Sequence, residues 1–124
     1  MTRILIVEDE DFLIKALVDN FEIEGFTVES AVNGEDAMNK VSKQKPDMVL
    51  LDLLLPKKGG FDVLKELKAN PEWNLIPVIV LSNLGGDEQI KRALEMGADD
   101  YFVKSQHPIE EVIQKVKQVL QGEK

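Results

Sequence analysis

Met48-Val49-Leu50-Leu51-Asp52 is a short apolar run that ends in a carboxylate. Four consecutive apolar residues are typical of a strand buried on both faces, and burying a carboxylate at its end is costly unless the charge is compensated. Three other apolar runs end in polar residues: Ile4–Val7 before Glu8 and Asp9, Val78–Leu81 before Ser82, and Tyr101–Val103 before Lys104. Because parallel strands of an α/β sheet bring their carboxyl ends to one edge, we expect these polar groups to share a pocket.

Helical patterns separate the apolar runs along the whole chain. Expected strands are 4–7, 26–31, 48–51, 78–81 and 101–103, each followed by apolar residues at helical spacing, with Pro108 as the first residue of the last helix. This (βα)5 pattern predicts an α/β fold: a doubly wound, three-layer structure around a five-stranded parallel sheet. The order 2-1-3-4-5 is common in such folds, and it places at an edge the second strand, which alone lacks a chemically useful residue at its end.

Length and composition limit the possible functions. A chain of 124 residues has the size of one domain, and we expect residues 1–124 to form it. The net charge of −8 argues against binding to nucleic acid or anionic membranes through bulk charge. There is no cysteine, so disulfide and thiol chemistry are excluded. The apolar runs are too short to span a bilayer, and the N-terminus lacks a signal-peptide core, so we expect a cytoplasmic location.

The expected pocket would combine carboxylates, a hydroxyl and an ammonium group. Taken singly, these residues have ordinary explanations: acids cap helices, and a serine or lysine after a strand is often solvated. Converging carboxylates, however, repel one another unless cations offset their charge. Mg²⁺ suits the site best, since it needs few protein ligands and retains water. An oxygen of Asp52 can then attack phosphorus, while Lys104 and the metal neutralise the phosphoryl oxygens and Ser82 hydrogen-bonds one of them.

Four motifs occur in a specific order along the chain. They are Ile4–Glu10, then Leu51-Asp52-Leu53 with Pro56 and Gly60, then Ile76–Ser82, and finally Gly97–Lys104. In order and spacing these motifs resemble the receiver domain of two-component response regulators, including chemotaxis regulators, and the resemblance covers the whole chain.

The resemblance implies a phosphorelay chemistry at Asp52. Asp52 would accept a phosphoryl group from a histidine kinase or phosphotransfer protein. Mg²⁺ would be held by Asp9, Asp52 and the backbone carbonyl of Leu54, with Glu8 acting through water. The chain would then be a signalling module and no enzyme, limited to self-phosphorylation and slow self-dephosphorylation.

The resemblance also implies a switch and an output surface. Ser82 would move toward the phosphoryl group, and Tyr101 would turn from an exposed to a buried position. These movements would alter the surface of the fourth helix, fifth strand and fifth helix, which would pass the signal to an effector protein or a fused output domain. We expect a monomer or a weak phosphorylation-dependent dimer, either stand-alone or cut from a longer regulator, without direct contact to nucleic acid or membrane.

Two other functions are compatible with parts of the pattern. An aspartate-dependent phosphohydrolase also forms an aspartyl phosphate, but it usually carries a second Asp where this chain has Leu54. A flavodoxin-like flavin protein needs a phosphate-binding loop after the first strand, where the acids from Glu8 to Asp11 would repel phosphate.

Departures from the family pattern give two further expectations. Lys104 is followed by Ser105 instead of proline, so we expect a trans peptide bond between them. Leu54 and Leu84 occupy the positions that border the approach of hydrolytic water, and Asn83 stands where a small residue is usual. Because leucine cannot hydrogen-bond water, we expect slow loss of the phosphoryl group.

Overall fold

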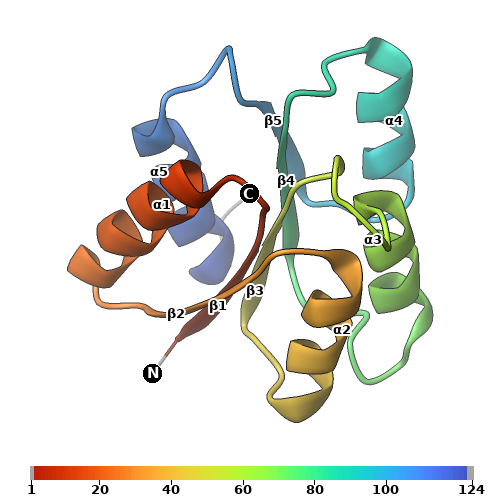
Figure 1. The fold of residues 1–124 in the computed structure, drawn as a ribbon, viewed down its shortest axis with the longest axis horizontal. Helices are drawn as coiled ribbons and strands as arrows, with labels where there is room; N and C mark the ends of the chain where they lie inside the picture. Colours follow the sequence, from red (N-terminus) through yellow and green to blue (C-terminus); the bar gives the residue numbers. More distant parts are fainter. Residues whose placement is uncertain (1, 123–124) are drawn as a thin grey trace.

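Five parallel strands form a single sheet in the computed structural model, which describes residues 2–122 (Figure 1). The strand order is β2-β1-β3-β4-β5, as predicted. The strands are β1 (Arg3–Val7), β2 (Thr27–Ala31), β3 (Met48–Leu51), β4 (Val78–Ser82) and β5 (Asp100–Val103). The helices are α1 (Asp11–Ile23), α2 (Gly34–Lys43), α3 (Gly60–Ala69), α4 (Asp87–Glu95) and α5 (Ile109–Leu120).

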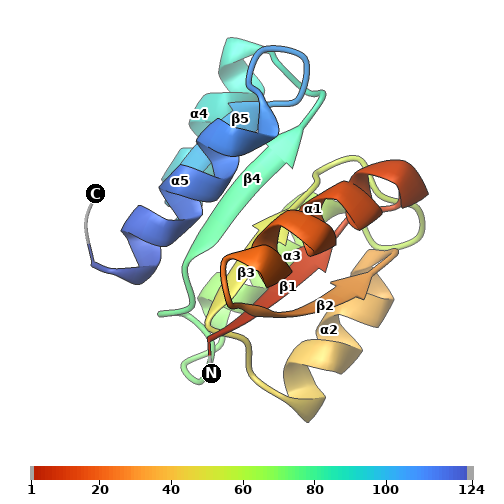
Figure 2. The same ribbon diagram turned by 90° about the vertical axis from the view of Figure 1, so that its left-hand side faces the viewer.

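Helices cover both faces of the sheet, which gives the expected three layers (Figures 1 and 2). On one face, Leu5 and Val7 of β1 belong to a core shared with α2, α3 and α4. On the other face, Ile4 and Ile6 belong to a core shared with α1 and α5. Burial on both sides explains why the central strands are continuously apolar, and each fully buried aliphatic side chain contributes about 1.5–3 kcal/mol.

Five element boundaries differ from the predicted ones. Three of them extend a strand by one residue, since β1 begins at Arg3, β4 ends at Ser82 and β5 begins at Asp100. Strand β2 begins at Thr27, because the Phe26 N–H donates to the Phe21 carbonyl at 3.1 Å instead of to the sheet. The rings of these two residues meet edge-on, with centroids 5.9 Å apart. Pro108 is the N-cap of α5 and not its first helical residue, since its ψ of 157° is extended. Each of the five differences involves one residue, and the strand order is unaffected.

The backbone after β5 has the predicted conformation. The peptide bonds between residues 2 and 122 are all trans, and this includes the bond between Lys104 and Ser105. None of the helices in that range has the length and apolar character needed to cross a lipid bilayer.

Candidate functional site

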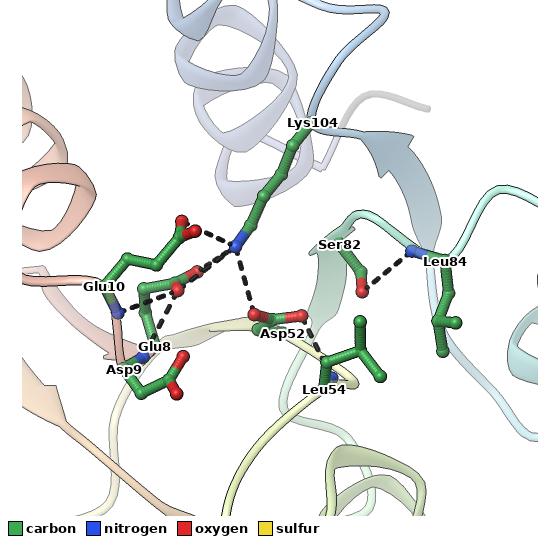
Figure 3. Close-up of polar contacts among 8 residues, drawn as sticks. All are labelled: Glu8, Asp9, Glu10, Asp52, Leu54, Ser82, Leu84 and Lys104. Atoms are coloured by element: carbon green, nitrogen blue, oxygen red, sulfur yellow. Dashed lines mark hydrogen bonds and ion pairs between the residues drawn. The ribbon is translucent and has the colours of Figure 1, made fainter.

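The predicted polar residues meet at the carboxyl edge of the sheet (Figure 3). Asp52 follows β3 directly, and its N–H donates to the Val7 carbonyl at 2.9 Å, so the ladder with β1 continues to this residue. Glu8 likewise donates its N–H to the Ala31 carbonyl of β2 at 2.9 Å. These backbone bonds fix both carboxylates in a buried position, where Glu8 is 2% and Asp52 is 3% exposed.

Lys104 lies at the centre of the acidic cluster. Its ammonium is 3.0 Å from a carboxylate oxygen of Glu8, 3.0 Å from Asp52 Oδ2 and 3.1 Å from Glu10. Burial alone would lower the pKa of Lys104, but hydrogen bonds to Glu8, Asp52 and Glu10 and the charge of Asp52 together raise it. The lysine therefore stays protonated and offsets part of the buried negative charge.

Glu10 is a member of the cluster that the sequence analysis missed as a site residue. It is exposed and does not directly follow a strand. Its carboxylate nevertheless reaches Lys104 from the connection between β1 and α1. The run of acids after β1 was the available signal, because it places a third carboxylate next to Glu8 and Asp9.

The carboxylates of Glu8 and Asp52 also receive backbone hydrogen bonds. Glu8 Oε2 accepts the N–H groups of Asp9 at 3.2 Å and Glu10 at 3.1 Å. Asp52 Oδ1 accepts the N–H of Leu54 at 3.1 Å. Burial raises the pKa of Glu8, the hydrogen bond from Lys104 lowers it, and repulsion from Asp52 raises it again, so the net shift is upward. Lys104 alone thus leaves the acidic pair incompletely neutralised.

A group of three acids has the arrangement of a cation site. One oxygen each from Glu8, Asp9 and Asp52 lies within 4.8 Å of the others. Two of these side chains are buried and Asp9 is exposed, so the group is open on one side to a hydrated ion. Carboxylate oxygens are the ligands that Mg²⁺ prefers, and it retains several waters when bound. The donor set therefore fits Mg²⁺, and Leu54, the third expected ligand residue, lies next to Asp52 (Figure 3).

Ser82 lies on the opposite side of Asp52 from the acids (Figure 3), and Tyr101 shares a hydrogen-bonding partner with it. Ser82 is fully buried at the end of β4, and its hydroxyl accepts the N–H of Leu84 at 3.4 Å. The expectation that Tyr101 starts in an exposed position is wrong for this structure, since it is 8% exposed. Its hydroxyl donates to the Leu84 carbonyl, a partner offered by the connection between β4 and α4. Burial, and then the charge of Asp52, raise the pKa of Tyr101.

The two leucines expected at the rim of the pocket have different surroundings. Leu54 is 51% exposed and stands next to Asp52, whereas the Leu84 side chain is directed away from the carboxylates (Figure 3). Leu84 packs against the core that β1 shares with α2, α3 and α4, and Asn83 is exposed. Of the two leucines, only Leu54 therefore borders the Asp52 carboxylate.

The fold and this acidic edge together define a receiver domain. Residues 4–117 match the family described as Response regulator receiver domain, and the chain belongs to that family. It is 38% identical over 120 residues to the alkaline phosphatase synthesis transcriptional regulatory protein PhoP of Bacillus subtilis, covering 95% of this chain and 48% of PhoP. The chain spans less than half the length of the first curated relatives that it matches.

Solved structures show the same fold. The BeF3-activated N-terminal receiver domain of Klebsiella pneumoniae RstA has a TM-score of 0.87 and 28% identity, covering 96% of this chain and 98% of that one. The Mn(2+)-bound form of response regulator Rcp1 has a TM-score of 0.85 and 27% identity, covering 95% and 93% of the two chains.

Proposed function

We propose that this receiver domain is a phosphorylation-controlled switch whose phosphoryl acceptor is Asp52. The observation that carries the proposal is the position of Asp52, which is 3.0 Å from the Lys104 ammonium and has oxygens of Glu8 and Asp9 within 4.8 Å. Asp52 thus contacts the lysine, belongs to the group of three acids that fits a cation, and directly follows the central strand β3.

The chemistry starts from an oriented carboxylate. The Leu54 N–H holds Oδ1 of Asp52 and the Lys104 ammonium holds Oδ2, so the group presents its oxygens in a fixed plane. Attack on phosphohistidine forms an O–P bond to Asp52 and breaks the P–N bond, and its electron pair stays on the imidazole nitrogen. Such transfers depend mainly on positioning and on stabilisation of the phosphoryl charge.

The surrounding residues have separate tasks in this proposal. Lys104 neutralises a phosphoryl oxygen on one side, and the Ser82 hydroxyl donates to another after it releases the Leu84 N–H. Asp9, Asp52 and the Leu54 carbonyl would hold Mg²⁺, with Glu8 acting through water. When bound, the ion neutralises charge on the transferred group. The Mn(2+)-bound form of the structural relative Rcp1 supports a divalent ion for this family.

The output follows from the coupling of Ser82 to Tyr101. Both residues hydrogen-bond the backbone of Leu84, one at its N–H and the other at its carbonyl. A shift of Ser82 toward a phosphoryl group would therefore disturb the connection that leads into α4. We propose that the surface of α4, β5 and α5 transmits this change, by a shift between existing populations, to an effector protein or a fused output domain.

We also propose a phosphoryl donor, a cellular location and an oligomeric state for the domain. The donor is a histidine kinase or phosphotransfer protein, and the domain works in the cytoplasm as a monomer or weak phosphorylation-dependent dimer. Residues 1–124 act as one module, stand-alone or within a longer regulator. The domain catalyses only its own phosphorylation and slow dephosphorylation, and it makes no direct contact with nucleic acid or membrane.

The test is incubation of the domain with Mg²⁺ and acetyl phosphate, followed by intact mass and NMR. We expect a mass increase of one phosphoryl group that requires Mg²⁺ and is absent in Asp52→Asn, which should keep the fold. Asp47→Asn is the matched control, because Asp47 precedes the same strand at its other end. Undiminished Mg²⁺-dependent labelling of Asp52→Asn would contradict the proposal.

A further inference from the structure

The β3–α3 loop (residues 52–59) carries both Asp52 and Leu54, so its position determines the geometry of the metal site. Its start is fixed by the Leu54 N–H on Asp52 Oδ1, and its end by the Gly60 N–H on the Leu53 carbonyl at 3.2 Å. Between these points the loop extends away from the sheet and passes next to the first turn of α2 (Figures 1 and 2).

One backbone hydrogen bond joins the middle of this loop to α2. The Gly34 N–H, at the first position of the helix, donates to the Lys58 carbonyl at 3.1 Å. This N–H would otherwise lack a partner, since the first N–H groups of a helix have none within it. The N-cap side chain of Asn33 satisfies the N–H of Asp36 and leaves that of Gly34 for the loop.

The contact between Gly34 and Lys58 is too close for any side chain at position 34. A Cβ placed on Gly34 would lie 2.2 Å from the Lys58 carbonyl oxygen, 2.6 Å from its Cβ and 2.8 Å from its carbonyl carbon. Two of these three atoms belong to the backbone, so rotation of the Lys58 side chain cannot relieve the clash. A residue larger than glycine therefore requires the loop and the helix to separate.

The residue before Lys58 has an unfavourable backbone conformation. Lys57 has a φ of 59°, in the left-handed region that residues other than glycine rarely adopt. Such a conformation persists only where the surroundings hold it. The Gly34 bond acts on the very next residue, and an ion pair between Lys58 and Glu66 of α3 adds a second restraint.

We propose that Gly34 is a positioning residue for the metal site. By holding Lys58 it fixes the β3–α3 loop and, four residues earlier, the backbone of Leu54 that would supply a ligand to Mg²⁺. This inference rests on the proposed function, and it adds that the start of α2 is coupled to metal binding although it contributes no ligand.

The test compares two glycine variants of the same region. Gly34→Ala introduces the forbidden Cβ, whereas Gly59→Ala places a Cβ with nothing within 4 Å and at an ordinary φ of −73°. Mg²⁺ affinity is measured by NMR titration at a temperature where both variants are folded. We expect about tenfold weaker binding for Gly34→Ala, which corresponds to about 1.4 kcal/mol, and a change below about twofold for Gly59→Ala. Equal affinities for the two variants would overturn the inference.

A second measurement needs no variant and covers the case in which Gly34→Ala does not fold. Because coupling is reciprocal, Mg²⁺ should slow amide exchange at Gly34 by the same factor of about ten. The Gly25 amide, which donates to the Glu22 carbonyl at 3.0 Å at the end of α1, is the control and should not change. Equal effects on both amides contradict the inference. A parent chain that neither binds Mg²⁺ nor is labelled by acetyl phosphate contradicts the proposed function itself.

Discussion

The Lys104 ammonium lies 3.0 Å from Asp52, a residue 52 positions earlier in the chain. The same ammonium also contacts Glu8, so one cation faces two buried carboxylates that follow different strands. The strands β1, β3 and β5 must all be in place before this contact forms. Lys104 therefore links the stability of the domain to the charge of its site.

Removal of this cation should destabilise the domain. We expect Lys104→Met to lower the free energy of unfolding by about 3 kcal/mol at neutral pH without metal, because it leaves Glu8 and Asp52 buried without a counter-charge. Lys117→Met is the control, since Lys117 pairs with Glu24 at the surface and should cost less than about 1 kcal/mol. Urea unfolding measures both values, and equal losses would contradict the prediction.

Loss of Asp9 should weaken metal binding selectively. We expect Asp9→Ala to reduce Mg²⁺ affinity at least about tenfold, or 1.4 kcal/mol, because one oxygen of the acidic group is removed. Without metal the variant should be slightly more stable, since repulsion among the acids decreases. Asp11→Ala changes the net charge equally but lies outside the group. Calorimetric titration of both variants decides the matter, and equal affinities would exclude a role of Asp9 as ligand.

Dephosphorylation should depend on Leu54 more than on Leu84. Leu54 stands next to Asp52 and cannot hydrogen-bond an attacking water, whereas Leu84 is directed away from the carboxylates (Figure 3). We expect slow decay in the parent and about tenfold faster decay in Leu54→Asn, or 1.4 kcal/mol of barrier. Leu84→Glu should have a smaller effect. The dephosphorylation rate is measured as the decay of the phosphorylated fraction after removal of acetyl phosphate. An unchanged rate in Leu54→Asn would refute the prediction.

The ionisation of Tyr101 should be delayed in the folded chain. It is the single tyrosine, and burial and the charge of Asp52 raise its pKa above 10.0. The tyrosine of the unfolded chain loses its proton near pH 10.0, before that of the folded chain. The stability contributed by the neutral hydroxyl is therefore fully present below pH 10.0, and it is lost as the pH rises through the higher pKa of the folded state. Absorbance titration should show a lower pKa in Asp52→Asn. A Tyr101→Phe variant should lack this part of the alkaline loss of stability, and an identical pH profile would count against the prediction.

The strands and the main site residues could be predicted from the sequence because they depend on local pattern, whereas the predicted strand order rests on what is common in such folds. Continuous apolar runs indicate strands buried on both faces, and parallel strands place whatever follows them at one edge. Glu8, Asp9, Asp52, Ser82 and Lys104 could therefore be assigned to a common pocket before their distances were known. The trans bond after Lys104 was predictable for a similar reason, since it follows from the absence of proline.

Only the tertiary structure decided the contacts that depend on the path of a loop. Glu10 reaches Lys104 because the connection after β1 turns toward β5, and the Tyr101 hydroxyl finds a partner because the connection after β4 presents the Leu84 carbonyl. Likewise, Gly34 meets Lys58 across 24 positions through a loop with an unusual backbone angle at Lys57. No periodicity encodes such approaches, because they depend on how separate segments pack against the finished sheet.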